Sequence, residues 1–477
     1  MSESLKGKTA KGVLWSSVER FSTQGVQFVI MIIMARLLTP NDYGLIGMLA
    51  IFLAVSQSLI DSGFSQALIR KQQRTETDNS TVFYFNLAVG VVLYLFLFLS
   101  APWVADFYNT TELTAVMRVV CLGVIINSLA VVQRALLTVN IDFKTQAKAS
   151  FSAALISGCA GIGLAYSGYG VWALAVQQLL NLGINTGLLW LFSSWRPKRL
   201  YSWQSFRELF AFGSKLLASG LLGTLYSNIY TIVIGKLFSA GNLGHYTRAQ
   251  HFAEFPSSNL TGIMQRVTYS VLCSIQEDDK RLENVYRKFL KLSAFVVFPL
   301  MLGLSAVAHP FIWVTIGEQW EFCAVLLQIL CFSMMWYPIH AINLNLLQVK
   351  GRSDLFLRLE IIKKILGISV LCITAPFGLI WMCYGQIFNS LVALVINTYY
   401  TGKLIHIGFL KQMRDLLPTL LLSLSMFALV LYVNRFIDAV LWKLVAGTLI
   451  GALYYVSCSI LFRFSELKEI LSLTKKR

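Results

Sequence analysis

Val82–Ala101 reads VFYFNLAVGVVLYLFLFLSA, twenty residues without a charged side chain. A helix rises about 1.5 Å per residue, so a stretch of this length spans the hydrocarbon core of a bilayer, which is about 30 Å thick. Similar segments recur along the 477-residue chain, as at Leu420–Val433 and Val440–Phe462. Their apolar runs are continuous rather than alternating, which argues against a transmembrane β-barrel. We therefore predict an all-α polytopic membrane protein with about 14 transmembrane helices.

The connections between these segments alternate between rich and poor in Lys and Arg. With the first helix at about Val13–Ala35, the even-numbered connections and both tails hold 32 of the 40 Lys and Arg residues, and Arg134, Lys144 and Lys148 are assigned to one of them. Because cytoplasmic loops carry such an excess, the pattern predicts that both termini are cytoplasmic. Cationic loops that face anionic lipid also account for the net charge of +17, so we expect no nucleic-acid partner.

Two decapeptides lie 200 residues apart and resemble each other: ARLLTPNDYG at 35–44 and GKLFSAGNLG at 235–244. Further matches follow in the same order at slightly larger offsets. The last, at an offset of 210, pairs Leu136-Leu137 and Val139 with Leu346-Leu347 and Val349. The ordered series indicates an internal duplication.

The repeat unit would hold six helices, an even number, so both copies have the same orientation in the membrane. Parallel repeats of this kind are related by an axis along the membrane normal, with the site between them. We predict one lobe at 1–200 and a second at 201–411. Residues 412–477 would add two extra helices and a basic cytoplasmic tail.

The chain shows no motif for enzyme chemistry or ATP binding. GxxxxGK[ST], HExxH, GxSxG and metal-spaced His or Cys sets are all missing from the sequence. We expect no catalytic residue, no metal site and no cofactor other than a coupling ion. Transport is then the class of function that the topology favours.

Ionisable residues inside the apolar segments are the candidates for function. A charge at the centre of a bilayer costs roughly 2.5–3.5 kcal/mol on insertion scales, so it needs a partner or a wet cavity. Candidates for binding an anionic substrate such as a pyrophosphate are the cations Arg20, Lys215, Arg248 and Arg118. Candidates for ion coupling or ion pairing are the acids Glu19, Asp61 and Glu254.

Structural explanations compete with these assignments. Glu19, Arg20 and Asp61 would also suit an ion pair that only joins the first two helices. Arg118, Arg248 and Lys215 would also suit side chains that reach to the lipid headgroups. The sequence leaves both alternatives open.

Several segments resemble the polysaccharide transporter family, the Wzx-like flippase branch of the multidrug/oligosaccharidyl-lipid/polysaccharide exporter superfamily. They are ARLLTPNDYG (35–44), NIDFK (140–144), GYGVWALAVQQ (168–178), LGHYTRAQ (243–250) and NLLQVKGRSD (345–354). The resemblance extends over nearly the whole chain. It implies twelve or fourteen helices, with two six-helix lobes in a V around a central cavity.

The resemblance also implies a function. Family members sit in the bacterial inner membrane and move undecaprenyl-pyrophosphate-linked oligosaccharide to the periplasmic leaflet, for lipopolysaccharide, capsule or exopolysaccharide. It implies alternating access driven by an ion gradient, with H⁺ or Na⁺ as the coupling ion. The expected partners are the lipid-linked oligosaccharide, membrane lipids, and a polysaccharide polymerase with other assembly proteins.

Two other functions remain open. The first is a cation-coupled small-molecule exporter of the multidrug type, which the basic intramembrane residues disfavour because cationic drugs require acidic cavities. The second is a membrane glycan polymerase or ligase. Such enzymes need a sizeable outer loop with catalytic residues, whereas Pro102–Leu113 and His309–Glu321 are the longest outer connections here and hold no Lys or Arg.

Overall fold

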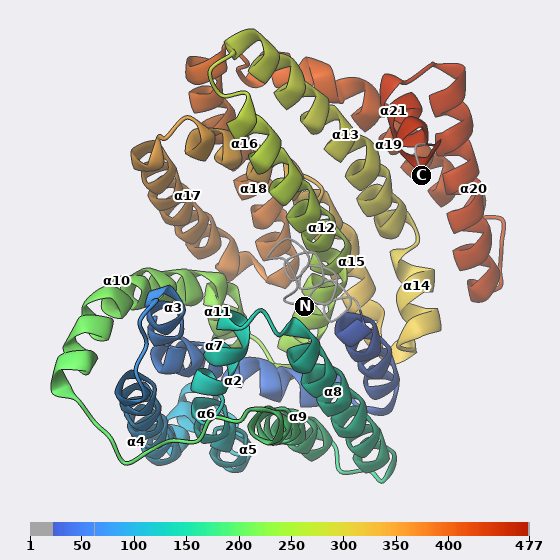
Figure 1. Cartoon of the computed structure of the whole chain (residues 1–477). Helices are drawn as coiled ribbons and strands as arrows, with labels where there is room; N and C mark the ends of the chain where they lie inside the picture. Colours follow the sequence, from blue (N-terminus) through green and yellow to red (C-terminus); the bar gives the residue numbers. More distant parts are fainter. Residues whose placement is uncertain (1–21, 62, 476–477) are drawn as a thin grey trace. The chain divides into compact units, whose positions relative to one another are not determined.

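The computed structural model describes residues 22–61 and 63–475, and every regular element in that part of the chain is a helix (Figure 1). The chain divides into two compact units, Met1–Gly244 and His245–Arg477. The lobe boundaries that the repeat predicts, 1–200, 201–411 and 412–477, stay a prediction.

The first unit, blue to green in Figure 1, begins with an apolar helix at Ser22–Leu37. Its other helices are α2 (Pro40–Asp61), α3 (Phe64–Arg70), α4 (Glu76–Tyr108), α5 (Leu113–Val120), α6 (Leu122–Ser128), α7 (Val131–Val139), α8 (Phe143–Tyr166), α9 (Val171–Phe192), α10 (Trp203–Ser227) and α11 (Ile229–Leu237). Helix α12 (Ala240–Ser274) starts in this unit and continues into the second.

The second unit holds the rest of α12 and is yellow to red beyond it. Its elements are α13 (Asp279–Ala306), α14 (Ala308–Thr315), η1 (Glu318–Trp320), α15 (Glu321–Met334), α16 (Tyr337–Val349), α17 (Ser353–Thr374), η2 (Ala375–Phe377), α18 (Leu379–Ile405), α19 (Phe409–Asn434), α20 (Val440–Leu461) and α21 (Ser465–Lys475). Helix α13 packs against α19, and α19 packs against α20.

Within the described residues, nine helical segments are long and apolar enough to cross a membrane, and a bent pair in α10 makes a tenth. The predicted number of about 14 stays a prediction. Helix α9 illustrates the difference: it has 22 residues, the length of a span, but Gln177, Gln178, Asn181 and Asn185 lower its hydropathy. A helix with such polar residues can be long enough to cross a membrane while its mean hydropathy stays below that of a typical span.

The two repeated decapeptides adopt the same local structure. In the first copy, the backbone N–H of Asp42 donates to Thr39 Oγ1 at 3.3 Å, and α2 begins between them. In the second copy, the N–H of Asn242 donates to Ser239 Oγ at 3.2 Å, and α12 begins between them. A Ser or Thr hydroxyl that accepts from a free N–H of the first turn is a helix N-cap. The repeat therefore marks two equivalent helix starts.

The repeat at an offset of 210 also recurs as one backbone shape. Helices α7 and α16 end at Val139 and Val349, and each is followed by a residue with positive φ, Ile141 at 56° and Gly351 at 68°. The N–H of the next residue, Asp142 or Arg352, then donates back to the carbonyl of Leu137 or Leu347 at 2.9 and 2.8 Å. Helices commonly end in this way, with a residue in the left-handed conformation and a following N–H that bonds back to a carbonyl of the last turn.

The two equivalent helix starts pack against each other inside the first unit. A Cβ added to Gly44 would lie 1.7 Å from the carbonyl oxygen of Ala240, and a Cβ added to Gly244 would lie 1.8 Å from that of Pro40. The contact is reciprocal, since each glycine meets the first residue of the other helix. Only glycine permits this approach of two backbones.

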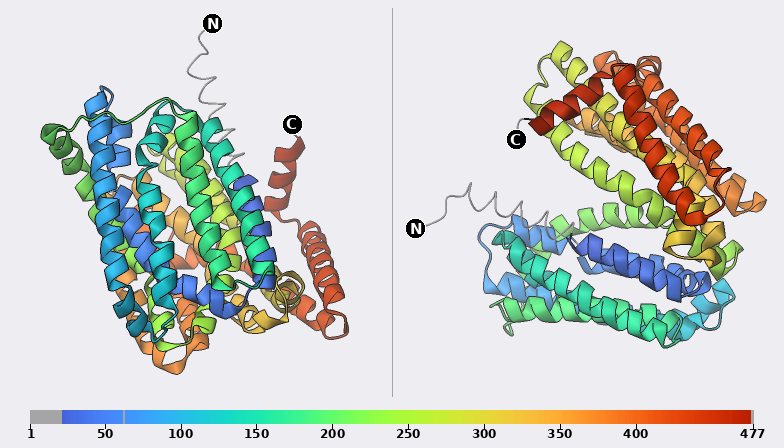
Figure 2. Two further views of the ribbon diagram at one scale, coloured as in Figure 1. Left: turned by 90° about the horizontal axis from the view of Figure 1, so that it is seen from below. Right: turned by 90° about the vertical axis from the view of Figure 1, so that its right-hand side faces the viewer.

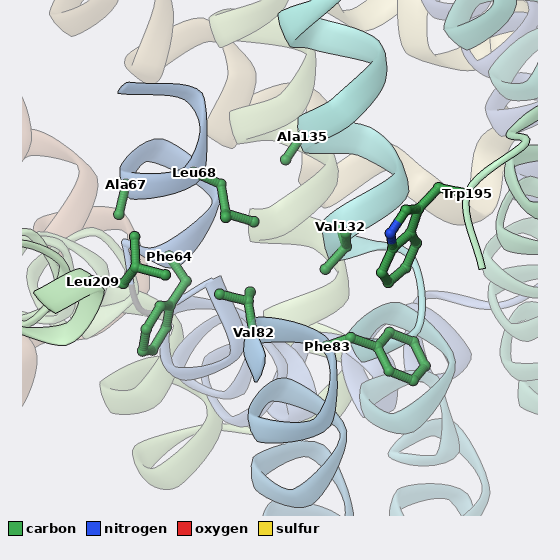
Figure 3. Close-up of a cluster of buried hydrophobic side chains, with 9 residues drawn as sticks. All are labelled: Phe64, Ala67, Leu68, Val82, Phe83, Val132, Ala135, Trp195 and Leu209. Atoms are coloured by element: carbon green, nitrogen blue, oxygen red, sulfur yellow. The ribbon is translucent and has the colours of Figure 1, made fainter. Parts of the chain in front are cut away.

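The end of the first unit that carries α3, the start of α4 and the start of α10 has an aromatic core. Its buried side chains are Phe64, Ala67 and Leu68 of α3, Val82 and Phe83 of α4, Val132 and Ala135 of α7, Trp195 of the connector after α9, and Leu209 of α10 (Figure 3). The indole N–H of Trp195 donates to Glu76 at 3.2 Å, which fastens the connector to α4.

Charged side chains close the same end. Lys71 Nζ lies 3.1 Å from both Asp78 of α4 and Glu208 of α10. Burial alone would lower the pKa of Lys71, but its hydrogen bonds to the two carboxylates outweigh that effect, so the pKa is raised. One ammonium thus ties together the end of α3 and the starts of two other helices.

We predict that Gly44→Ala destabilises the protein by about 1–3 kcal/mol, because the new methyl group would overlap the Ala240 carbonyl. Gly183→Ala is the matched control, since nothing lies within 4 Å of a Cβ added there in α9. Thermal unfolding of both purified variants in detergent measures the difference. A Gly44→Ala melting temperature equal to that of the unaltered protein would contradict the contact.

Candidate functional site

A break in a candidate membrane span places Asp61 at the end of a helix. The span Pro40–Arg70 consists of α2, which ends at Asp61, and α3, which begins at Phe64. Gly63 between them has a φ of 70°, a conformation that glycine adopts without steric cost. At membrane depth, irregular backbone is tolerated only where protein covers it or where it lines a wet cavity. Asp61 therefore lies two residues before a left-handed backbone conformation within a candidate span.

Helix α10 bends opposite this break. Its two halves, Trp203–Ser214 and Leu216–Ser227, meet at 42°. A Cβ added to Gly63 would lie 2.6 Å from the Cα of Gly213, so the backbones touch where both helices are interrupted. Lys215, a predicted substrate-binding residue, belongs to the bend of α10, although its side chain lies outside the described atoms. The structure thus brings the backbones around Asp61 and Lys215 together.

A chain of polar side chains leads from Asp61 into the first unit. Gln57 Nε2 donates to Asp61 Oδ2 at 3.0 Å, and Gln57 Oε1 accepts a short hydrogen bond from the amide of Asn127 in α6. Asn127 Oδ1 in turn accepts from Arg134 Nη2 of α7 at 2.8 Å. Arg134 and Asp61 attract each other electrostatically. A carboxylate and a guanidinium are therefore linked through two amides across three helices.

Arg134 was assigned to a cytoplasmic connection from the sequence, and the structure places it inside α7. That helix is the last part of the candidate span Leu113–Val139. The sequence contained a signal for one pair only, because Gln57 and Asp61 are four residues apart on one helix face, whereas Asn127 and Arg134 belong to different helices. Gln57, Asn127 and Arg134 are thus polar residues of the candidate site that the sequence prediction missed.

The predicted partners Glu19 and Arg20 lie outside the described residues. The proposed pairing of Arg20 with Asp61 therefore stays a prediction. Among the described residues, the hydrogen-bonding partner of the Asp61 side chain is Gln57.

Arg118 is engaged by its own neighbourhood in the first unit. It lies in α5, where its Nε donates to the carbonyl of Phe98 at 3.4 Å and its guanidinium lies 4.5 Å from the centre of the Phe98 ring. A cation over an aromatic face is attracted by the negative charge of that face. This arrangement supplies a structural role for Arg118, and its predicted role in substrate binding stays a prediction.

Arg248 and Glu254 lie on α12 in the second unit. Glu254 accepts a hydrogen bond from Gln250 of the same helix at 2.7 Å, and Arg248 is half-buried and interacts electrostatically with His251. No described contact joins Arg248 to Glu254. Their roles in substrate binding and ion coupling stay predictions.

The second unit has a polar network of a different kind. His340 of α16 is within hydrogen-bonding distance of Ser390 (3.1 Å) and Asn397 (3.2 Å) of α18. Asn343 exchanges hydrogen bonds of 3.1 Å with Gln412 of α19. Polar side chains that satisfy one another across helices commonly hold membrane helices together. We interpret this network as helix packing, in contrast to the charged chain of the first unit.

The charged chain offers two kinds of chemistry. The planar guanidinium of Arg134 can donate two parallel hydrogen bonds to a phosphate. The carboxylate of Asp61, at a helix break in an apolar span, can accept a proton or bind a cation. A conventional structural role, in which the two charges only neutralise each other, predicts energetic coupling but no effect of either residue on transport.

We predict that Arg134→Gln lowers the stability of the first unit by about 3 kcal/mol, because it removes the guanidinium that attracts the carboxylate of Asp61. Adding Asp61→Asn should recover part of this loss, since no charge is then left unpaired. Thermal unfolding of the two single variants and the double variant in detergent measures the coupling. Strictly additive effects would mean that Arg134 and Asp61 do not interact.

Known proteins resemble this chain along its length. The model of a family described as "Polysaccharide biosynthesis protein" matches residues 33–325. Lipopolysaccharide biosynthesis protein WzxC of Escherichia coli (strain K12) is 25% identical over 401 residues, 83% of this chain and 80% of that protein. Succinoglycan biosynthesis transport protein ExoT of Rhizobium meliloti (strain 1021) is 24% identical over 490 residues, 100% of this chain and 98% of that protein.

Two solved structures share the fold. Lipid II flippase MurJ, in an inward closed conformation, superposes with a TM-score of 0.77 over 94% of this chain and 99% of its own, at 14% identity. An inward-facing transporter of the multidrug resistance MATE family of the MOP superfamily superposes with a TM-score of 0.61 over 79% of this chain and 95% of its own, at 14% identity. The predicted all-α polytopic membrane fold is confirmed. Because the matching model spans more than half of the sequence, this chain belongs to the polysaccharide biosynthesis protein family.

Proposed function

We propose that this protein translocates a lipid-linked oligosaccharide from one leaflet of the membrane to the other. It acts as a transporter rather than an enzyme. The observation that carries the proposal is the charged chain from Asp61 to Arg134, which lies among apolar spans of a member of this family. Relatives named for lipopolysaccharide biosynthesis and for succinoglycan transport support an assignment to glycan export.

The substrate that we propose is an undecaprenyl-pyrophosphate-linked oligosaccharide. Its pyrophosphate requires cations within the apolar region, and its lipid stays in the bilayer throughout. The cations Arg20, Lys215 and Arg134 would bind the pyrophosphate through charge-assisted hydrogen bonds. Arg248 and Arg118 are further candidates for the same role.

An ion gradient would drive the cycle, because the sequence supplies no nucleotide site. Asp61, with Glu19 and Glu254 as further candidates, would bind the coupling H⁺ or Na⁺. Neutralising a carboxylate at a helix break changes the attraction between that break and Arg134, which gives the ion a means to alter the site. The lobes at 1–200 and 201–411 would then alternate between openings to the two leaflets.

We place the protein in the bacterial inner membrane with both termini in the cytoplasm. The support for this orientation is the distribution of Lys and Arg among the connections. A polysaccharide polymerase and other assembly proteins would take up the translocated units on the far side.

We predict that a deletion strain accumulates complete lipid-linked oligosaccharide units on the cytoplasmic leaflet and loses the surface polymer. Mass spectrometry of extracted undecaprenyl-pyrophosphate species, with a membrane-impermeant probe of sidedness, measures both and identifies the glycan. Single units that accumulate on the periplasmic leaflet would instead place the protein in polymerisation. An unchanged pool together with new drug sensitivity would favour a small-molecule exporter.

A second prediction concerns the cations. Replacing Arg20 and Lys215 together by Gln should abolish surface polysaccharide without loss of the protein from the membrane, since the pyrophosphate would lose its positive partners. The matched control replaces Arg435 and Lys443, which lie around the turn between α19 and α20, and should leave the polymer unchanged. Surface polysaccharide and membrane protein are quantified in parallel. Normal polymer in the Arg20/Lys215 variant would refute the assigned role.

A further inference from the structure

A cavity of about 660 Å³ lies in the second unit where α13, α19 and α20 meet α21. Helices α20 and α21, red in Figure 2, join at a bend. Arg463 at this bend has a φ of 53°, and the N–H of Phe464 donates back to the carbonyl of Ser459 at 3.0 Å. The bend turns α21 back over the ends of α13 and α19, where it covers one side of the cavity.

The lining of the cavity has an apolar part and a charged part. The apolar part consists of Pro418, Leu421, Leu422, Phe462 and Phe464. The charged part consists of Lys291, Asp415 and Glu466. From Asp415 to Ser425 the lining follows α19 over eleven residues, a rise of about 15 Å along the helix. These dimensions and this polarity fit an amphiphile with a charged head and the beginning of a hydrocarbon chain.

Asp415 is fully engaged by protein groups. Arg287 donates two hydrogen bonds to it, of 2.6 Å to Oδ2 and 2.8 Å to Oδ1, and Lys291 Nζ lies 3.3 Å from the same Oδ1. The carboxylate is 6% exposed, so these cations satisfy it almost out of reach of water. Lys291 carries three donors and directs one of them at Asp415, which leaves donors for a ligand.

Glu466 has no hydrogen-bonding or ion-pair partner among the side chains that the structure describes. Glu466 is 8% exposed and lines both this cavity and a neighbouring cavity of about 290 Å³. Among the residues whose side chains the structure describes, none donates a hydrogen bond or forms an ion pair with its carboxylate. The carboxylate faces the cavity without a described cation beside it, so a ligand that brings a positive donor would be favoured there.

We propose that this cavity binds a glycerophospholipid whose headgroup carries both a phosphate and a primary ammonium, such as phosphatidylethanolamine. The ammonium would donate to Glu466, the phosphate would accept from Lys291, and the chain would lie over the apolar lining. A purely anionic lipid would leave Glu466 unsatisfied. A cationic amphiphile would leave Lys291 without an anionic partner in the ligand. The zwitterionic head matches both charges in one ligand.

The position of Glu466 in the first turn of α21 does not by itself account for the site. The free N–H groups of that turn favour a negative charge. However, no described N–H donates to this carboxylate, and the side chain faces a cavity that also holds a cation and an apolar surface. The unsatisfied carboxylate and the cavity are independent observations that point to the same ligand.

The test uses the full-length protein, purified in detergent, stripped of lipid and returned to mixed micelles. The micelles contain equal amounts of phosphatidylethanolamine, phosphatidylglycerol and phosphatidylcholine, and native mass spectrometry reports the lipid retained. We expect selective retention of phosphatidylethanolamine. Glu466→Gln should reduce it about tenfold, the factor for a lost charge-assisted hydrogen bond.

Glu469→Gln is the matched control, because Glu469 lies one turn further along α21 and pairs with Lys288 at 2.8 Å without lining the larger cavity. It should leave the retention of phosphatidylethanolamine unchanged. An equal loss in both variants would mean that these acids only position α21, and would overturn the proposal.

Three other results would also overturn it: equal retention of phosphatidylglycerol, no effect of Glu466→Gln, or displacement of the bound phospholipid by a polyprenyl pyrophosphate. The last would assign the cavity to a lipid-linked substrate. The assay measures lipid binding and not transport, so its result tests this proposal independently of the proposed function.

Discussion

Backbone amides inside hydrocarbon have no water to bind, and this constraint governs the rest of the structure. Each unpaired amide costs several kcal/mol, so a span is a helix wherever lipid surrounds it, and an interruption needs cover from protein. The break between α2 and α3 has such cover, because Gly63 lies against the backbone of Gly213. Polar side chains gather at the same place, where Asp61 ends α2 and its bonding chain begins. The site and the interruption of the helix therefore have one physical origin.

The sequence predicted which segments of the two halves correspond, and these segments have the same local structure. Thr39 and Ser239 cap equivalent helices, and the turns after Val139 and Val349 close alike, as the spacing of the repeats indicated. Arg134 was assigned to a connection, whereas the structure shows it in a helix, and the difference has a physical reason. The span Leu113–Val139 has 27 residues in three short helices, whereas an uninterrupted span of about 20 residues ends before Arg134. Gln57 and Asn127 meet across helices, and no sequence pattern identifies such a pair.

The two copies keep a common scaffold and differ in their chemistry. At an offset of 210 residues, Gln133 of α7 corresponds to Asn343 of α16, and both are almost fully buried polar residues. In the first unit the neighbouring polar chain ends in a carboxylate and a guanidinium. In the second unit Asn343 exchanges hydrogen bonds with the neutral side chain of Gln412. The helix ends and turns thus recur in both units, whereas the polar chain around Asn127 joins two charged groups and the network around Asn343 joins neutral side chains.

The reciprocal contact of Gly44 with Ala240, and of Gly244 with Pro40, also limits how the sequence can evolve. A larger residue at one glycine would have to be met by a backbone shift at the start of the other helix, 200 positions away in the chain. The two halves of the gene are therefore not free to diverge separately at this point. Among relatives, positions 40, 44, 240 and 244 should change as a group, which would keep the resemblance between the two decapeptides after the surrounding sequence has diverged.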